Sequence, residues 1–173
     1  ERMSSQLNFG YPWWLTYGHL VVTAITLAFL ALGQALRWPR VLMLFIGVLT
    51  LWSVAAFTTA RLLNVNGRLS FPTPRFLNSG RGRILDMGAG TGKSTIMVLE
   101  ARPQTTVVAL DLFTESYKEH FGPGGNGRDR LQANLKAAGL QDRAEVQAGD
   151  MRKLPFQEAT FDGVVSTYAI DHL

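Results

Sequence analysis

Two long apolar runs occupy the first third of the chain. Residues 15–36 contain no charge, and residues 41–60 form a second uncharged run of 20 residues. At about 1.5 Å of rise per residue, a helix over either run is long enough to cross the hydrocarbon core of a bilayer, which is about 30 Å thick. Only residues 37–40 separate the runs, so we expect a tight helical hairpin interrupted at Pro39.

Two helices buried in the core of a soluble bundle are the alternative interpretation. Neither run has the polar face that a helix of a soluble hairpin presents. A cleaved signal peptide is disfavoured, because there are two runs and no short apolar region with a small-residue cleavage site. Aromatic residues at the ends of the pair match the belts found at bilayer interfaces: Trp13, Trp14, Tyr17 and Trp38. We therefore predict a transmembrane hairpin over residues 1–60.

A few polar or bulky residues lie within the two runs. His19, Thr23 and Thr26 fall on roughly one stripe of the first helix, which is typical of hydrogen bonding between helices. Trp52 lies deep in the second run, and we expect it to face a partner helix or a bound lipid.

The second half of the chain alternates strand-type and helix-type patterns. Short apolar runs of strand length lie at 84–87, 107–111, 144–151 and 161–167. Helices are predicted at 93–102, ending before Pro103, and at 128–139, ending at Gly139. The glycine-rich residues 121–127 should form a loop. Strands alternating with helices predict an α/β doubly wound sheet over residues 83–173.

The stretch Asp86-Met87-Gly88-Ala89-Gly90-Thr91-Gly92 lies between the first strand and the first helix. Glycines at alternate positions permit a sharp turn and close approach of a ligand, and a helix N-terminus follows. A phosphate-binding P-loop needs glycine where Met87 stands, and the dinucleotide fingerprint needs Gly or Ala where Lys93 stands. The pattern D-x-G-x-G-x-G is matched at every position.

This pattern resembles motif I of the class I S-adenosylmethionine-dependent methyltransferases. The resemblance extends over most of residues 83–173, because 107–111, 144–151 and 161–167 resemble the second, third and fourth strands of these enzymes. It implies S-adenosyl-L-methionine as cofactor. The turn residues implied at the methionine end of the cofactor are Asp86, Gly88, Ala89, Gly90, Thr91 and Gly92.

The resemblance also assigns residues to the rest of the cofactor. Asp111, 19 positions after Gly92, is expected to accept hydrogen bonds from the ribose hydroxyls, with Leu112 against the adenine. Asp150 is expected to meet the adenine amine, with Met151 beside it. Thr167 ends the fourth strand at the same site.

A general base is harder to assign. Tyr168, Asp171 and His172 lie where the fourth strand opens toward the substrate, and His172 has a suitable intrinsic pKa. A structural role for His172 is the alternative. The chain contains no cysteine, which excludes a disulfide, a thiolate metal site and a cysteine nucleophile. No metal-ligand spacing is present, and methyl transfer needs no metal.

Charge separates the regions further. The five charges between residues 61 and 83 are all arginines, whereas residues 84–173 carry nine basic and twelve acidic residues. We expect this basic linker, residues 61–82 with Arg83, to contact anionic lipid headgroups. Five arginines follow the second run, whereas only two lie in the hairpin loop. Because the side of a membrane protein with more positive charge is usually cytoplasmic, we expect the catalytic domain on the cytoplasmic side. Nucleic acid is not an expected partner, because the net positive charge comes from the linker, whereas residues 84–173 carry more acidic than basic residues.

We therefore expect a membrane-bound methyltransferase acting on a lipid or other lipophilic small molecule. A hairpin that only tethers the enzyme is the alternative for the substrate. A non-catalytic binding protein for S-adenosylmethionine or S-adenosylhomocysteine and an NAD-dependent membrane oxidoreductase are the alternatives for function. The family's sheet has more strands than the four predicted here, so we expect a domain lacking its C-terminal strands, with a homo-oligomer or a completing chain covering the exposed edge.

Overall fold

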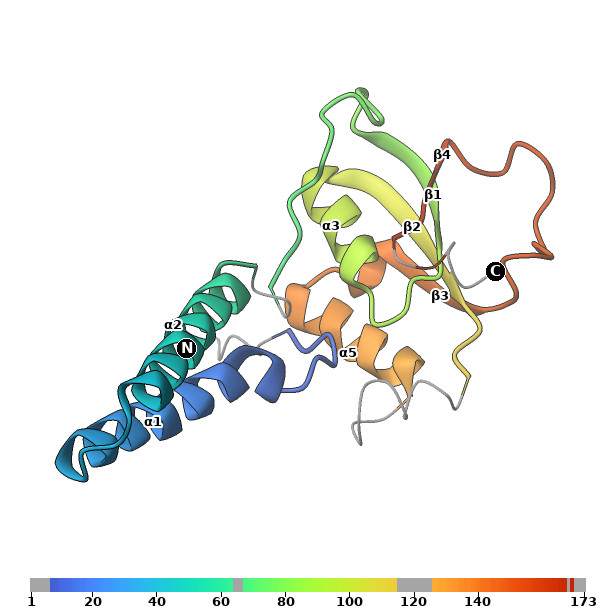
Figure 1. Ribbon diagram of the computed structural model, residues 1–173. Helices are drawn as coiled ribbons and strands as arrows, with labels where there is room; N and C mark the ends of the chain where they lie inside the picture. The colour runs from blue at the N-terminus through green and yellow to red at the C-terminus, as the bar shows by residue number, and fades with distance from the viewer. Residues whose placement is uncertain (1–6, 64–66, 115–125, 168, 170–173) are drawn as a thin grey trace, which may run out of the picture. The chain divides into compact units, whose positions relative to one another are not determined.

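The computed structural model describes residues 7–63, 67–114, 126–167 and 169 of the 173-residue chain. The chain divides into two compact units (Figure 1). One unit, Tyr11–Gly67, contains the two apolar helices. The other unit combines Glu1–Gly10 with Arg68–Leu173 and contains the sheet.

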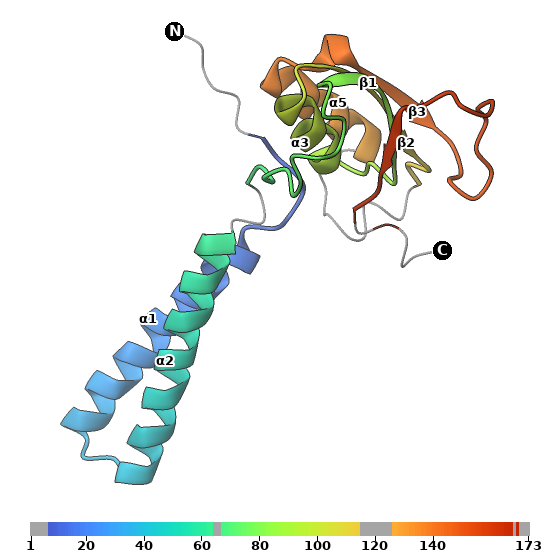
Figure 2. The same cartoon turned by 90° about the horizontal axis from the view of Figure 1, so that it is seen from above.

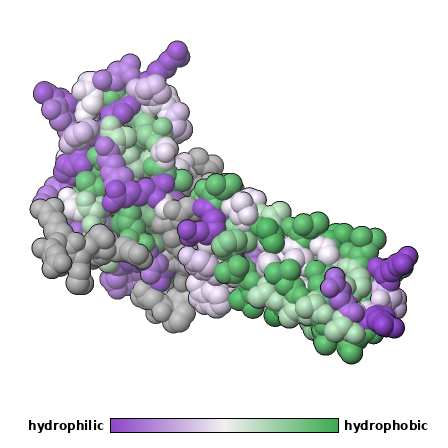
Figure 3. Space-filling view, turned by 90° about the vertical axis from the view of Figure 1, so that its left-hand side faces the viewer, coloured by the Kyte–Doolittle hydropathy of each residue, from purple (hydrophilic) through white to green (hydrophobic). Residues whose placement is uncertain are grey.

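The helical unit is a hairpin of α1 (Trp14–Ala35) and α2 (Arg40–Leu63). Both helices are long and apolar enough to cross a membrane, a criterion of length and composition that a buried core helix or a signal sequence also meets. The helix over 41–60 continues to Leu63, so Arg61 lies in its last turn rather than in the linker to which the sequence assigned it. Much of the visible surface of the hairpin is apolar (Figure 3).

Small polar side chains form the interface between α1 and α2. Thr23, Thr26, Thr50 and Ser53 are all buried. The hydroxyls of Thr23 and Ser53 lie 2.8 Å apart and form a hydrogen bond between the helices. His19 and Trp52 make an edge-to-face ring contact at 5.6 Å. The polar stripe predicted on α1 therefore serves helix pairing.

The N-terminal residues correct one predicted boundary. The sequence placed residues 1–60 together in the hairpin, but the described residues up to Gly10 belong to the α/β unit. Phe9 is only 1% exposed there. The segment has no period of its own, and its contacts are with residues far along the chain, so its location could not be predicted from local pattern.

The α/β unit contains a parallel sheet with the order β3-β2-β1-β4. Its strands are β1 (Arg81–Met87), β2 (Gln104–Asp111), β3 (Ala144–Ala148) and β4 (Gly163–Val165). The run predicted at 144–151 ends as a strand at Ala148, because the chain turns there and the Lys153 amide donates to the Asp150 carbonyl. The chain passes outward from β1 to β3 and then crosses to β4 on the other side of β1. This reversal places the ligand crevice at the carboxyl end of β1.

The two helices that connect β1, β2 and β3 lie on one side of the sheet (Figure 2). α3 (Lys93–Ala101) joins β1 to β2, and α5 (Gly127–Ala138) precedes β3, from which the short helix η1 (Gln141–Arg143) separates it. Right-handed crossovers in one direction put both helices on the same face. Gly139 ends α5 with a φ of 70°, as the sequence predicted. Most of the predicted loop at 121–127 lies outside the described residues.

Both faces of the central strands are buried. Leu85, Val108 and Leu110 form a cluster on one face, covered by side chains from the stretch between β3 and β4: Met151, Phe156 and Phe161. On the other face Asp86 bonds to α3. Where both faces are buried, at residues 84–85 of β1 and 107–110 of β2, the sequence is continuously apolar.

Candidate cofactor site

The glycine turn follows β1 directly at the carboxyl edge of the sheet. Gly88, Gly90 and Gly92 have φ values of 73°, 54° and 90°, which side chains rarely adopt. The amides of Gly88 and Ala89 donate to the Leu110 carbonyl at 2.9 and 3.1 Å, so the end of β2 supports the turn. Gly92 then leads into α3, whose N-terminus faces the same edge.

Close neighbours explain why two of these positions are glycine. A Cβ on Gly88 would lie 2.2 Å from the Cβ of Ala169 and 3.1 Å from the Cε of Met151. A Cβ on Gly92 would lie 3.0 Å from the Cγ of Leu131 on α5. The turn is therefore tightly packed from both sides.

Asp86 is a fully buried carboxylate beneath the turn. Its Oδ2 accepts hydrogen bonds from the hydroxyls of Ser94 and Thr95 on α3, at 2.7 and 2.6 Å. Within the described residues its Oδ1 has no hydrogen-bond partner. The pKa of Asp86 is raised to about 6: burial is the main cause, nearby Asp111 adds to it, and the hydrogen bonds from Thr95 and Ser94 act in the opposite direction.

Asp111 closes β2 and faces the turn. Its Oδ2 accepts from the amide of Gly90 at 2.9 Å, and its Oδ1 accepts from the amide of Phe113 at 3.0 Å. A carboxylate has about four acceptor sites, so these bonds are compatible with the predicted bonds from ribose hydroxyls. Leu112, predicted to lie against the adenine, is 52% exposed beside it.

Asp150 and Met151 follow β3 at the same edge. Asp150 is paired with Arg152, whose Nη2 lies 2.7 Å from its Oδ2. The hydrogen bonds from Arg152 lower the pKa of Asp150 to about 2, so it is ionised at neutral pH. Met151 reaches the turn at Gly88. The adenine contacts predicted for both residues stay predictions.

The end of β4 completes this edge. The Ser166 hydroxyl donates to the Met87 carbonyl at 2.9 Å, which holds the end of β4 beside the end of β1. Thr167 follows, half-buried. The three candidates for a general base, Tyr168, Asp171 and His172, lie outside the described residues.

Several residues at the site were not predicted from the sequence. The hydroxyls of Ser94 and Thr95 bond to Asp86. From α5, Leu131 packs against Gly92 and Asn134 bonds to the Thr91 carbonyl. Phe9 is buried beside Thr91. Asn134 lies on the same buried face of α5 as Leu131 and Leu135, and this helical spacing is the signal that could have identified it. Nothing in the sequence around Phe9 indicated its position.

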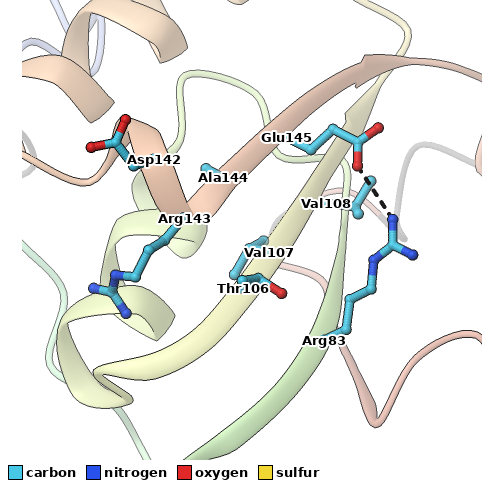
Figure 4. Close-up of a pocket in the computed structure, with 8 residues that line it drawn as sticks. All are labelled: Arg83, Thr106, Val107, Val108, Asp142, Arg143, Ala144 and Glu145. Carbon is cyan, nitrogen blue, oxygen red and sulfur yellow. Dashed lines mark hydrogen bonds and ion pairs between the residues drawn. The ribbon is translucent and has the colours of Figure 1, made fainter.

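A separate hollow lies toward the amino-terminal parts of the strands (Figure 4). Its volume is about 230 Å³, and its charged lining residues are Arg83, Asp142, Arg143 and Glu145. Arg83 and Glu145 form an exposed ion pair at 3.2 Å. None of the predicted cofactor residues lines it, and it lies away from the carboxyl edge where doubly wound sheets bind ligands.

The turn and its surroundings fit S-adenosylmethionine. The glycines allow the backbone to approach a ligand, and the buried Oδ1 of Asp86 is an acceptor that needs a donor such as an ammonium group. The family profile described as "Methyltransferase domain" matches residues 85–173. The chain belongs to the methyltransferase-domain family. Its cofactor is S-adenosyl-L-methionine.

Individual relatives of the methyltransferase domain are distant. The chain is 31% identical over 90 residues to 24-methylenesterol C-methyltransferase 2 of Oryza sativa subsp. japonica, a match covering 52% of the chain and 22% of that protein. The chain thus spans about a fifth of the length of this curated relative.

Solved structures with a similar domain are also known. One is a putative S-adenosylmethionine-dependent methyltransferase from Methanococcus maripaludis, with 24% identity and a TM-score of 0.45, covering 57% of this chain and 39% of that one. Another is a putative sarcosine dimethylglycine methyltransferase from Galdieria sulphuraria, with 20% identity and a TM-score of 0.40, covering 50% and 27%.

Proposed function

We propose that this protein is a membrane-bound S-adenosylmethionine-dependent methyltransferase that methylates a lipid or other lipophilic small molecule at the cytoplasmic membrane surface. The observation that carries the proposal is the presence, in one chain, of a methyltransferase glycine turn and two long helices with exposed apolar side chains. The turn supports the reaction class, and the helices support an acceptor located in the membrane.

The residues of the turn act by binding and orienting. S-adenosylmethionine, when bound, supplies a methyl group on a sulfonium sulfur that a nucleophile can displace. Asp86 and the glycines Gly88, Gly90 and Gly92 would hold its methionine end, and Asp111 would hold its ribose. Fixing two reacting groups in line can lower the barrier by up to about 7–11 kcal/mol.

The apolar surface of the hairpin supports a membrane location. Large apolar side chains are exposed along both helices, including Phe29 at 46%, Leu44 at 70% and Leu51 at 72%. Full burial of an apolar side chain of this size contributes about 1.5–3 kcal/mol, and a bilayer that covers these partly exposed side chains would recover a part of that free energy for each. The small polar residues face inward between the helices, as in membrane helix pairs.

The basic linker supports the cytoplasmic side and anionic lipid as a partner. Arg75 is exposed and is the linker's candidate for headgroup contact. Arg61, in the last turn of α2, donates to the Tyr17 hydroxyl at 3.2 Å. Arg68 and Arg83 are paired with Glu100 and Glu145. Those two pairs are exposed, so headgroups can still compete for the arginines.

The chemical class of the methyl acceptor is inferred from the proposed membrane location of the methyltransferase domain. A hydrocarbon-soluble acceptor concentrates in the bilayer, where a domain joined to two apolar helices meets it. The rice relative is named for a sterol acceptor, one lipophilic small molecule of this kind.

The test uses the full-length protein in sealed lipid vesicles with S-adenosylmethionine labelled at the methyl group. We expect label in the organic-soluble fraction, and little label in water-soluble acceptors of the same chemical type. S-adenosylhomocysteine should raise the Tm, since a ligand at 100 times its Kd stabilises the native state by about 2.7 kcal/mol, whereas ATP with Mg²⁺ should not.

The alternatives predict different results. Binding of S-adenosylhomocysteine without transfer to any acceptor would indicate a binding protein, and stabilisation by NAD alone would indicate an oxidoreductase. Equal transfer to bilayer and water-soluble acceptors would mean that the hairpin is a tether and that the lipophilic acceptor is wrong.

A further inference from the structure

The residues just before the first apolar helix are built into the glycine turn. We call Asn8, Phe9 and Gly10 the N-terminal strap. The strap belongs to the same compact unit as the sheet. α1 begins at Trp14, five residues after Phe9. Phe9 is 1% exposed, so its side chain is buried within this unit.

Asn134 joins the strap to the turn. Its Oδ1 accepts from the amide of Asn8 at 2.8 Å, and its Nδ2 donates to the carbonyls of Asn8 and Thr91, both at 2.9 Å. Asn134 is 3% exposed, and it is separated from Asn8 by 126 positions in the chain. One buried side chain thus bonds to the strap and to the central residue between Gly90 and Gly92.

Thr91 and Lys93 add two further contacts. The Thr91 hydroxyl donates to the Phe9 carbonyl at 3.1 Å, and Thr91 is 8% exposed. The Lys93 ammonium lies 5.6 Å from the centroid of the Phe9 ring, a cation–π distance. Burial lowers the pKa of Lys93, in agreement with its position in the first turn of α3 against the strap.

The turn needs such support because of its own sequence. Gly90 and Gly92 flank Thr91, and glycine loses more conformational freedom on ordering than any other residue. Fixing the backbone of one residue costs about 1–2 kcal/mol. If the strap did not order the turn beforehand, that cost would be subtracted from the binding of the cofactor.

We propose that the N-terminal strap is part of the cofactor site, and that Phe9 and Asn134 are positioning residues that hold the glycine turn ready for S-adenosylmethionine. This inference rests on the proposed function for its ligand. It follows that the cofactor affinity of the α/β unit depends on residues that precede the hairpin in the sequence, whereas the rest of this unit follows the hairpin.

The test compares Asn134 of α5 with Asn126, the residue that caps this helix, in the full-length protein in detergent micelles. Asn134→Ala removes the bonds to the strap and to Thr91. Asn126→Ala is the matched control, because Asn126 caps the same helix by accepting from the Asp129 amide at 2.8 Å but has no role at the turn. Both variants should lower the Tm. Only Asn134→Ala should weaken S-adenosylhomocysteine binding, by about tenfold or more, measured by calorimetry.

Phe9→Ala should weaken binding in the same way, and combining it with Asn134→Ala should add little, because both release the same strap. Phe9→Leu is a milder variant for use if Phe9→Ala does not fold. In the wild-type protein, S-adenosylhomocysteine should also slow hydrogen exchange at the amides of Asn8 and Gly10, which are both hydrogen-bonded.

The outcomes separate this inference from the proposed function. Wild-type protein that binds S-adenosylhomocysteine while the strap variants bind it equally well, with unchanged exchange at Asn8, would overturn the inference and leave the function standing. Weakened binding in the strap variants without transfer to any lipophilic acceptor would support the strap and contradict the proposed substrate. Wild-type protein that binds no S-adenosylhomocysteine would overturn both.

Discussion

Asp86 is fully buried, and one of its oxygens has no hydrogen-bond partner among the residues that the structure describes, so its charge opposes folding when no ligand is bound. Its pKa is about 6 in the folded protein against 3.8 when exposed. A raised pKa means that its contribution to stability is fully present below pH 3.8 and is lost as the pH rises through about 6. At about 1.4 kcal/mol per pKa unit, the loss by pH 8 is of the order of 3 kcal/mol.

Replacing Asp86 by asparagine removes this titration. Asp86→Asn keeps an acceptor for the hydroxyls of Ser94 and Thr95. Relative to the variant, wild-type protein should therefore lose stability between pH 4 and pH 8, measured by urea unfolding in one detergent. Parallel pH profiles for the two proteins would show that Asp86 does not titrate in this range.

Gly88 is required for space as well as for its dihedral angle, and Gly139 allows the two effects to be separated. Gly139 also has a positive φ, 70° against 73°, but a Cβ there would meet nothing within 4 Å. Gly88→Ala should weaken binding of S-adenosylhomocysteine by about 10-fold to 100-fold, because overpacking costs about 1–3 kcal/mol and displaces the turn.

The control substitution measures the cost of backbone strain alone, without a steric clash. Gly139→Ala should cost about 1–2 kcal/mol of stability through its left-handed backbone alone and leave the affinity for S-adenosylhomocysteine at the wild-type value. Titration calorimetry and urea unfolding of both variants provide the comparison. Equal effects of the two substitutions on affinity would contradict the role assigned to Gly88.

At the scale of elements, the connection between α3 and β2 depends on a single guanidinium. Arg143, at the end of η1, donates to the carbonyls of Leu99 and Pro103, both at 2.7 Å, with longer bonds to two neighbouring carbonyls. These carbonyls belong to the end of α3 and the residues after it, where helical hydrogen bonding stops. Arg143 thus holds the first crossover in place from the start of β3.

Removing this group should destabilise the α/β unit. Arg143→Ala should cost about 1.5–3 kcal/mol, the range for hydrogen bonds to a charged group. Arg83→Ala is the control, because its exposed pair with Glu145 contributes at most about 1 kcal/mol. Urea unfolding should rank the two variants in this order, and a larger loss for Arg83→Ala would contradict the assignment.

At the scale of the whole molecule, both ends of the hairpin lead into one folded unit. Asn8 is hydrogen-bonded within the α/β unit, and so is the linker, where Arg102 donates to the Phe76 carbonyl at 2.9 Å. A membrane hairpin with both ends in one domain must cross the bilayer an even number of times. The loop at residues 37–40 should then lie on the opposite side from the sheet.

The absence of cysteine from the chain makes this topology easy to test. Single cysteines are introduced as Gln34→Cys beside the hairpin loop and Gln157→Cys on the α/β unit, both at exposed positions. In right-side-out vesicles an impermeant maleimide should label the first variant and not the second, and inverted vesicles should reverse the result. Equal labelling of both variants would refute the two-span topology.

The sequence by itself determined which elements form and their order, although not the exact ends of α2 and β3. The two apolar runs predicted α1 and α2, because helix length and hydrophobicity are local properties. The spacing of Asp86 and its three glycines predicted the turn after β1, because only glycine tolerates the required backbone angles. The alternation of strands and helices predicted the parallel sheet.

Only the tertiary structure decided what depends on pairs distant in the chain. It placed Asn8 against Asn134, 126 positions away, and it moved the strap from the hairpin to the α/β unit. Within the described part of the chain, it also leaves Oδ1 of Asp86 without a hydrogen-bond partner and places Ala169 against Gly88. Such contacts are set by the packing of whole elements, and a short segment such as the strap has no periodicity that could reveal its partner in advance.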